Sequence, residues 1–272
     1  MTELLILFAE TVLCTLGVIV LCGLAVALCE FLFLRLMGRG VGGKIVKVTS
    51  IVGTPVHELG HALMCLLFGH NITDMKLWDP HAKDGTLGYV THSYNPKNPY
   101  KQLGNLFIGV GPVFSGLAVI TLLLWLCFPD TLGEHLALSG DMIASGDGIL
   151  SVLIEGVGMI PRMLGEMADG DIHVAWRIVG IVGMLSVSLH INLSPADVKG
   201  AARAVPWYLA LALVFSVIVV LCGSDAVAAV SGGLYAFAAY LVSLFSIVLV
   251  FSLVQVALAS AFWLIRLPFS RR

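Results

Sequence analysis

The stretch GTPVHELGHALMC, residues 53–65, places two histidines and one glutamate inside an otherwise apolar segment. The whole chain is unusually apolar, because 58% of its 272 residues are hydrophobic and only 12% are charged. Soluble domains have about 45–50% and about 25% of these classes. In a lipid-embedded segment, an unpaired carboxylate costs at least about 2.5–3.5 kcal/mol. The ionisable side chains of this stretch therefore indicate a function and not an incidental polar face.

Long apolar segments define the expected fold class. A transmembrane helix needs about 20 apolar residues, and six segments of the chain stand out: 4–37, 46–69, 104–128, 172–194, 205–223 and 226–267. We expect an all-α polytopic membrane protein of about six transmembrane helices. An N-terminal transmembrane anchor (1–45) precedes a core (46–204), and C-terminal transmembrane helices follow (205–272).

The segments between these helices are more polar. Residues 72–95 combine β-favouring side chains with turn-forming clusters, which predicts a small membrane-associated β-hairpin. Residues 129–171 are acidic, and in their second half polar side chains such as Glu155 and Arg162 recur opposite apolar ones. This pattern predicts a helix that lies in the extracytoplasmic membrane interface, and Pro161 argues against a full span there.

Charge sets the expected partners and orientation. A net charge of −2 without a basic stripe argues against nucleic acid, so we expect the lipid bilayer and a membrane protein or peptide as partners. Arg266, Arg271 and Arg272 place the C-terminus in the cytoplasm of what we expect to be a bacterial cell membrane. Residues 35–47 carry four basic side chains and would lie outside if 46–69 crosses fully. Whether that segment crosses or is re-entrant stays open.

The motif HELGH has the spacing of a metal-binding helix. His57 and His61 are four residues apart, so both imidazoles share one helix face and can bind one ion. Imidazole nitrogens suit Zn²⁺, and Glu58 beside them can act as a general base toward a water that the metal activates. Thr54 and Pro55 favour a helix start just before the motif.

A catalytic zinc needs a third protein ligand. The best candidate is Asp197 in the stretch HINLSPADVKGA, residues 190–201. His190 lies seven residues earlier on the same helical face and is the alternative ligand. Asn192, in the same stretch, is a possible supporting residue that could help to stabilise an oxyanion.

Together these residues resemble the site-2 protease family of intramembrane zinc proteases. The family has HExxH on one membrane helix and an aspartate from a later helix, near an N-x-x-P element that Asn192 and Pro195 match. A middle helix with a G-P element is also typical, and Gly111 and Pro112 match it. The resemblance implies a zinc endopeptidase that cleaves membrane-embedded or membrane-proximal substrates. It also implies a substrate-pairing hairpin, whose residues here are Leu87, Gly88, Tyr89, Val90 and Thr91.

Two other functions remain open. A non-proteolytic metal-binding membrane protein, such as a regulator or pseudoprotease, would use the same ligands without needing Glu58 as a base. A metal-ion transporter would also place histidine and carboxylate side chains within the membrane. Such a path usually needs polar residues in several spans, and 104–128 and 205–223 offer almost none.

Overall fold

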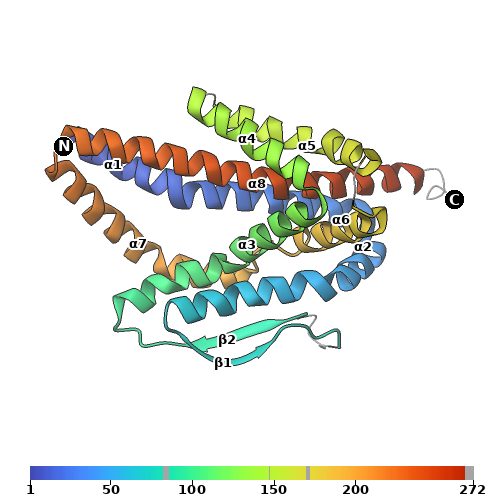
Figure 1. Ribbon diagram of the computed structural model, residues 1–272. Helices are drawn as coiled ribbons and strands as arrows, with labels where there is room; N and C mark the ends of the chain where they lie inside the picture. Colours follow the sequence, from blue (N-terminus) through green and yellow to red (C-terminus); the bar gives the residue numbers. More distant parts are fainter. Residues whose placement is uncertain (82–85, 147, 170–171, 267–272) are drawn as a thin grey trace.

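The chain folds into a bundle of long helices with a small two-stranded sheet on one side (Figure 1). A computed structural model describes residues 1–81, 86–146, 148–169 and 172–266. Within these ranges, four helices are long and apolar enough to cross a membrane: Thr2–Gly38, Pro99–Cys127, Pro195–Leu221 and Ser224–Arg266. The helical membrane class and the hairpin are therefore confirmed. Six crossings stay a prediction, as does the orientation that rests partly on Arg271 and Arg272, which lie outside the described residues.

The N-terminal helices form one nearly continuous rod as far as Gly38. Helix α1 (Thr2–Val12) passes through a π-helical turn, η1 (Leu13–Gly17), into α2 (Val18–Leu67). Gly38 interrupts α2 with φ 74° and ψ 158°, a conformation that glycine adopts without steric cost. Beyond this break, Ile45 and Val46 pack near Phe33, so the second half of α2 turns back along the first. The predicted helix start at Thr54 is wrong, because Pro55 lies inside α2.

The hairpin follows α2 directly. Strand β1 (Asn71–Lys76) pairs antiparallel with β2 (Tyr89–Ser93), and an irregularity between Ile72 and Asp74 shifts the register. Strand β2 lies between β1 and α2 in the view of Figure 1. The predicted hairpin at 72–95 is confirmed, apart from residues 82–85, which lie outside the described part of the chain.

Helix α3 (Pro99–Cys127) is central to the bundle and packs closely against two other helices. A Cβ added to Gly111 would meet the carbonyl oxygen of Gly60 in α2 at 2.6 Å. A Cβ added to Gly109 would meet the carbonyl oxygen of Asp197 at 2.7 Å. Two glycines of α3 thus let α2 and the helix that carries Asp197 approach the same segment from two sides, as small residues do in membrane bundles.

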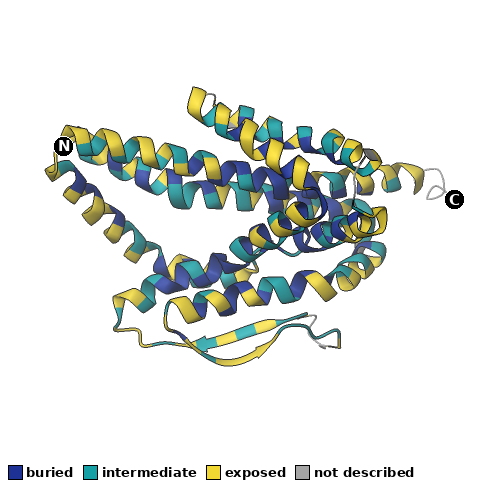
Figure 2. Ribbon diagram, viewed as in Figure 1, coloured by how far each residue is buried: buried dark blue, intermediate teal, exposed yellow. Residues whose placement is uncertain are grey.

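The remaining helices complete the bundle. They are α4 (Pro129–Ser145), α5 (Ile149–Asp169), α6 (Val174–Ser188), α7 (Pro195–Leu221) and α8 (Ser224–Arg266). The largest apolar core lies between α2, α3, α5, α6 and α8, whereas exposed residues run along the outer faces of the long helices (Figure 2). Many of these exposed residues are large and apolar, with Leu21 67% and Leu221 81% exposed. Such a surface fits a lipid environment.

Candidate metal centre

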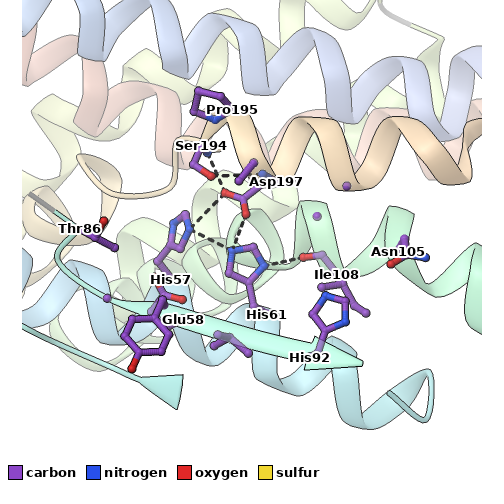
Figure 3. A pocket seen from close by; sticks show the side chains of 16 residues that line it. His57, Glu58, His61, Thr86, His92, Asn105, Ile108, Ser194, Pro195 and Asp197 are labelled. Atoms are coloured by element: carbon purple, nitrogen blue, oxygen red, sulfur yellow. Dashed lines mark hydrogen bonds and ion pairs between the residues drawn. The ribbon is translucent and has the colours of Figure 1, made fainter. Parts of the chain in front are cut away.

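Three side chains from two helices that are far apart in the sequence converge at one point. His57 and His61 extend from the second half of α2, and Asp197 extends from the first turn of α7 (Figure 3). The two Nε2 atoms are 3.2 Å apart. The Asp197 carboxylate lies 3.1 Å from Nε2 of His61 and 3.7 Å from Nε2 of His57. The three residues therefore form one compact group of nitrogen and oxygen ligands.

The orientation of His61 depends on a proline in α3. His61 donates from Nδ1 to the carbonyl oxygen of Ile108 at 2.7 Å. In an α-helix this carbonyl would accept from the backbone nitrogen of residue 112, but residue 112 is a proline and has no N–H. The helix therefore leaves the Ile108 oxygen free for the imidazole. The family resemblance included Pro112 but gave it no role. In this structure, Pro112 leaves the Ile108 carbonyl free to accept from His61.

The orientation of His57 depends on the end of α6. His57 donates from Nδ1 to the backbone carbonyl oxygen of His190 at 2.7 Å. This carbonyl lies two residues beyond the end of α6 at Ser188, in the segment that connects α6 to α7. The imidazole of His190 faces elsewhere, since its Nδ1 donates to the Ser186 carbonyl at 2.9 Å and its ring fills the space next to Gly53. His190 thus contacts the site through its backbone, and its side chain is not in the ligand group.

These hydrogen bonds fix the tautomers, because a carbonyl oxygen can only accept. Each neutral imidazole must carry its hydrogen on Nδ1, so both Nε2 atoms present lone pairs toward each other and toward Asp197. Three acceptors this close repel one another unless a cation or a proton lies between them. Histidines that bind metals commonly donate their second nitrogen in this way.

The separations also fit a zinc ion. Ligands at 2.0–2.1 Å from a tetrahedral centre are about 3.3–3.4 Å apart. The two Nε2 atoms are 3.2 Å apart, and Nε2 of His61 lies 3.1 Å from the nearer Asp197 oxygen. Taken as one atom from each residue, the three candidate ligand atoms all lie within 4.8 Å of one another. Two histidines and one carboxylate are a ligand set that leaves the fourth position open. The residues that are present therefore fit Zn²⁺, although its binding stays a prediction.

Asp197 has a second, structural role. Ser194 accepts from the backbone nitrogen of Asp197 at 3.2 Å, and the Asp197 carboxylate accepts from the Ser194 nitrogen at 2.8 Å. This reciprocal pair is a capping box at the start of α7. One carboxylate oxygen contacts the Ser194 nitrogen, whereas the other is the oxygen nearer to His61. The cap thus holds the acid in the direction of the histidines.

Glu58 lies next to the ligand group without belonging to it. It is 7% exposed and lines a cavity of about 610 Å³ together with the three ligands. A Cβ added to Gly88 would meet Cγ of Glu58 at 2.8 Å and Cγ2 of Thr54 at 2.7 Å. The chain just before β2 therefore runs directly over the glutamate, which only a glycine allows at this distance.

The predicted hairpin residues differ in their position. Gly88, Tyr89 and Val90 line the cavity with the ligands, and Leu87 lines an adjoining cavity of about 490 Å³. Thr91 does not line either cavity, and its hydroxyl donates to the carbonyl of Asp74 in the paired strand. With β1 on one side, the other edge of β2 has no strand partner among the residues that the structure describes.

Other residues around the site were predicted less fully or not at all. Asn192, the proposed supporting residue, lines the adjoining cavity with Glu30, His57 and Glu58. Sequence reasoning did not single out His92 or Asn105, which line the main cavity, or the carbonyl of Ile108. For Ile108 a signal existed, since a proline within a predicted helix always leaves the carbonyl four residues earlier without its usual donor.

No protein-family model, curated protein or solved structure matches this chain. Any functional conclusion therefore depends on the geometry of the site and on the sequence motifs.

Proposed function

We propose that the protein is an intramembrane zinc endopeptidase that hydrolyses peptide bonds of membrane-embedded or membrane-proximal substrates. The observation that supports this most is the convergence of His57, His61 and Asp197, with a glutamate beside them that is not needed as a ligand. A site that only binds metal has no use for that additional buried carboxylate.

Glu58 is the residue that would move the proton. When bound, zinc supplies the Lewis acidity that activates a water at neutral pH. Glu58 accepts a proton from the water that attacks the peptide carbonyl carbon. It then delivers this proton to the nitrogen that leaves when the carbon–nitrogen bond breaks. Its position in the same cavity as the ligands supports this role.

The hairpin would present the substrate. A peptide bond within a helix is shielded by the hydrogen bonds of the helix, so the substrate must be extended before it can react. The open edge of β2 can pair with an extended backbone by strand addition. Gly88 and Val90 line the cavity that contains Glu58, which supports an extended substrate passing along this strand. On the proposed orientation, the hairpin and the C-terminus share the cytoplasmic side.

The variant Glu58→Gln tests the proposal. Purified wild-type and variant proteins would be reconstituted with a panel of quenched fluorescent single-span peptides, and their zinc content would be measured. We expect Glu58→Gln to keep its zinc and to lose cleavage by about 10²–10⁴-fold, the usual contribution of a general base. The control Glu3→Gln removes an exposed carboxylate at the start of α1 and should cleave like the wild type.

Two outcomes would overturn the proposal. Undiminished cleavage by zinc-loaded Glu58→Gln would remove the glutamate from the reaction. Zinc uptake into sealed vesicles by the wild type, without cleavage of any peptide, would instead favour a metal-ion transporter.

A further inference from the structure

Helix α5 buries its charged side chains and exposes its apolar ones. The side chains of Glu155, Arg162 and Glu166 are only 10%, 21% and 8% exposed. On the opposite face, Leu150 is 69%, and Leu164 is 64% exposed. A helix at a water surface has the reverse arrangement. In the structure, the charged face of α5 therefore points toward the bundle and its apolar face points outward.

The inward side chains pair within α5 and with neighbouring elements. Arg162 forms a close ion pair with Glu155 of the same helix and lies 3.6 Å from Glu134 of α4. Glu166 accepts from the backbone nitrogen and the hydroxyl of Thr131, at 2.9 and 2.7 Å.

A second ion pair links α5 to α6. Nη2 of Arg177, which is 2% exposed, lies 3.6 Å from Glu166. Ionisable groups within a membrane are expected to face the interior of the bundle and to pair with one another. The charges of α5 follow both rules.

Among the side chains of α5 that the structure describes, none on the outward face is charged. The exposed positions with described side chains are Leu150, Ile154, Val157, Pro161, Leu164, Gly165 and Ala168. From residue 150 to residue 168 the helix rises about 27 Å at 1.5 Å per residue. This length is close to the hydrocarbon thickness of a bilayer, about 30 Å.

The apolar surface continues from α5 onto helices that are themselves candidate spans. A groove of about 220 Å³ lies between α5, α2 and α8. Its lining includes Leu153 of α5, Val18 and Cys22 of α2, and Phe245 and Leu249 of α8. Helix α8 and the segment Thr2–Gly38, which includes the first half of α2, are both long and apolar enough to cross a membrane. In a bilayer, lipid acyl chains would surround those two helices. The same acyl chains fit the apolar surface that continues onto α5.

We propose that α5 lies within the hydrocarbon layer beside α8 and that its outward face contacts lipid acyl chains. Because α5 contains charged residues and Pro161, its composition does not indicate a membrane helix. Prolines are nevertheless tolerated in membrane helices where neighbouring groups satisfy the freed backbone. Because α4 and α5 form a hairpin (Figure 1), the chain returns to the side it left. The proposal therefore does not change the orientation of the later helices.

Two labelling reactions on the unmodified protein in vesicles test this. Phospholipids with a diazirine in the acyl chain label residues that contact lipid, and hydroxyl radicals oxidise residues that contact water. We expect lipid adducts at Leu150, Ile154 and Leu164, with none at Val152 or Met159, which are 1% exposed on the inward face of the same helix. Leu253 of α8, 43% exposed, is the positive control for lipid contact.

Each alternative occupant gives a distinct result. Oxidation of Ile154 and Leu164 without lipid adducts would place the face in water. Neither product at these positions, with adducts present at Leu253, would mean that a second protein chain covers the face. Either result would overturn the proposal. The readout does not depend on proteolysis, so it can fail while the proposed function holds.

Discussion

His61 donates its Nδ1 hydrogen to the carbonyl oxygen of Ile108 at 2.7 Å, a carbonyl that is free only because the residue four positions later is proline. The sequence of α3 thus determines which nitrogen of a histidine in α2 is available to a metal. The backbone carbonyl of His190 accepts from Nδ1 of His57 and so leaves Nε2 of that histidine available to a metal.

Replacing this proline should weaken metal binding. Pro112→Ala restores a backbone N–H that competes with His61 for the Ile108 carbonyl. Loss of such outer partners typically lowers metal affinity by 10–100-fold, so we expect zinc affinity, measured by competition with a chelator, to fall by about tenfold or more. Pro206→Ala is the matched control, because Pro206 also lies inside a helix, α7, and is four residues after Ala202. Equal affinities for all three proteins would disprove the link.

The two roles of Asp197 can be separated by two variants. Asp197→Asn keeps an acceptor for the Ser194 nitrogen but removes the charge, so zinc affinity should fall strongly while the thermal stability of the zinc-free protein changes little. Ser194→Ala removes the cap and should cost about 1 kcal/mol of stability with a smaller loss of zinc. Calorimetric unfolding and zinc titration measure the two effects. If Asp197→Asn bound zinc like the wild type, the third ligand would have to be another residue.

Gly88 should be essential for activity and not for metal binding. The methyl group of Gly88→Ala would meet Glu58 and Thr54 at less than 3.0 Å, so the start of β2 must move away from the glutamate. We expect a large loss of peptide cleavage with unchanged zinc content. Gly43→Ala is the control, because nothing lies within 4 Å of its added methyl group. Normal cleavage by Gly88→Ala would show that the close approach of the strand has no part in catalysis.

We expect the stability of the hairpin to depend on pH through two histidines, His70 and His92. Nε2 of His70 donates to the Lys101 carbonyl at 2.8 Å, so its neutral ring uses Nδ1 to accept from Nδ1 of His92 at 3.0 Å. Burial lowers the pKa of both histidines below the ordinary value of 6.5, and the neighbouring His70 lowers that of His92 further. A lowered pKa means that the folded state resists protonation. The stability of the hairpin is therefore full above pH 6.5 and declines as the pH falls below it.

Limited proteolysis between pH 7.5 and pH 5.5 would measure this effect, with a protease that is active across that range. We expect several-fold faster cleavage within 71–93 at the lower pH. The double variant His70→Asn, His92→Gln should remove the pH dependence, whereas His81→Gln, which changes an exposed histidine, should keep it. A pH dependence that persists in the double variant would assign it to other groups.

Local patterns determined much of this protein from the sequence alone. The apolar segments predicted membrane helices, and β-favouring residues between turns predicted the hairpin. Four-residue spacing put His57 and His61 on one face of a helix, because helical periodicity is a local property. The start of the motif helix was predicted incorrectly. Thr54 and Pro55 favour a helix start, but α2 is continuous through both residues and is broken at Gly38 instead.

Only the tertiary structure decided which distant groups meet. It brought the Asp197 carboxylate, and not the His190 imidazole, to the histidine pair. It also supplied the carbonyls that fix both tautomers. The same holds for α5, whose two faces the sequence distinguishes without saying which one points inward. The physical reason is common to these cases: periodicity sets which side chains share a face, whereas the packing of helices far apart in the chain sets what that face contacts.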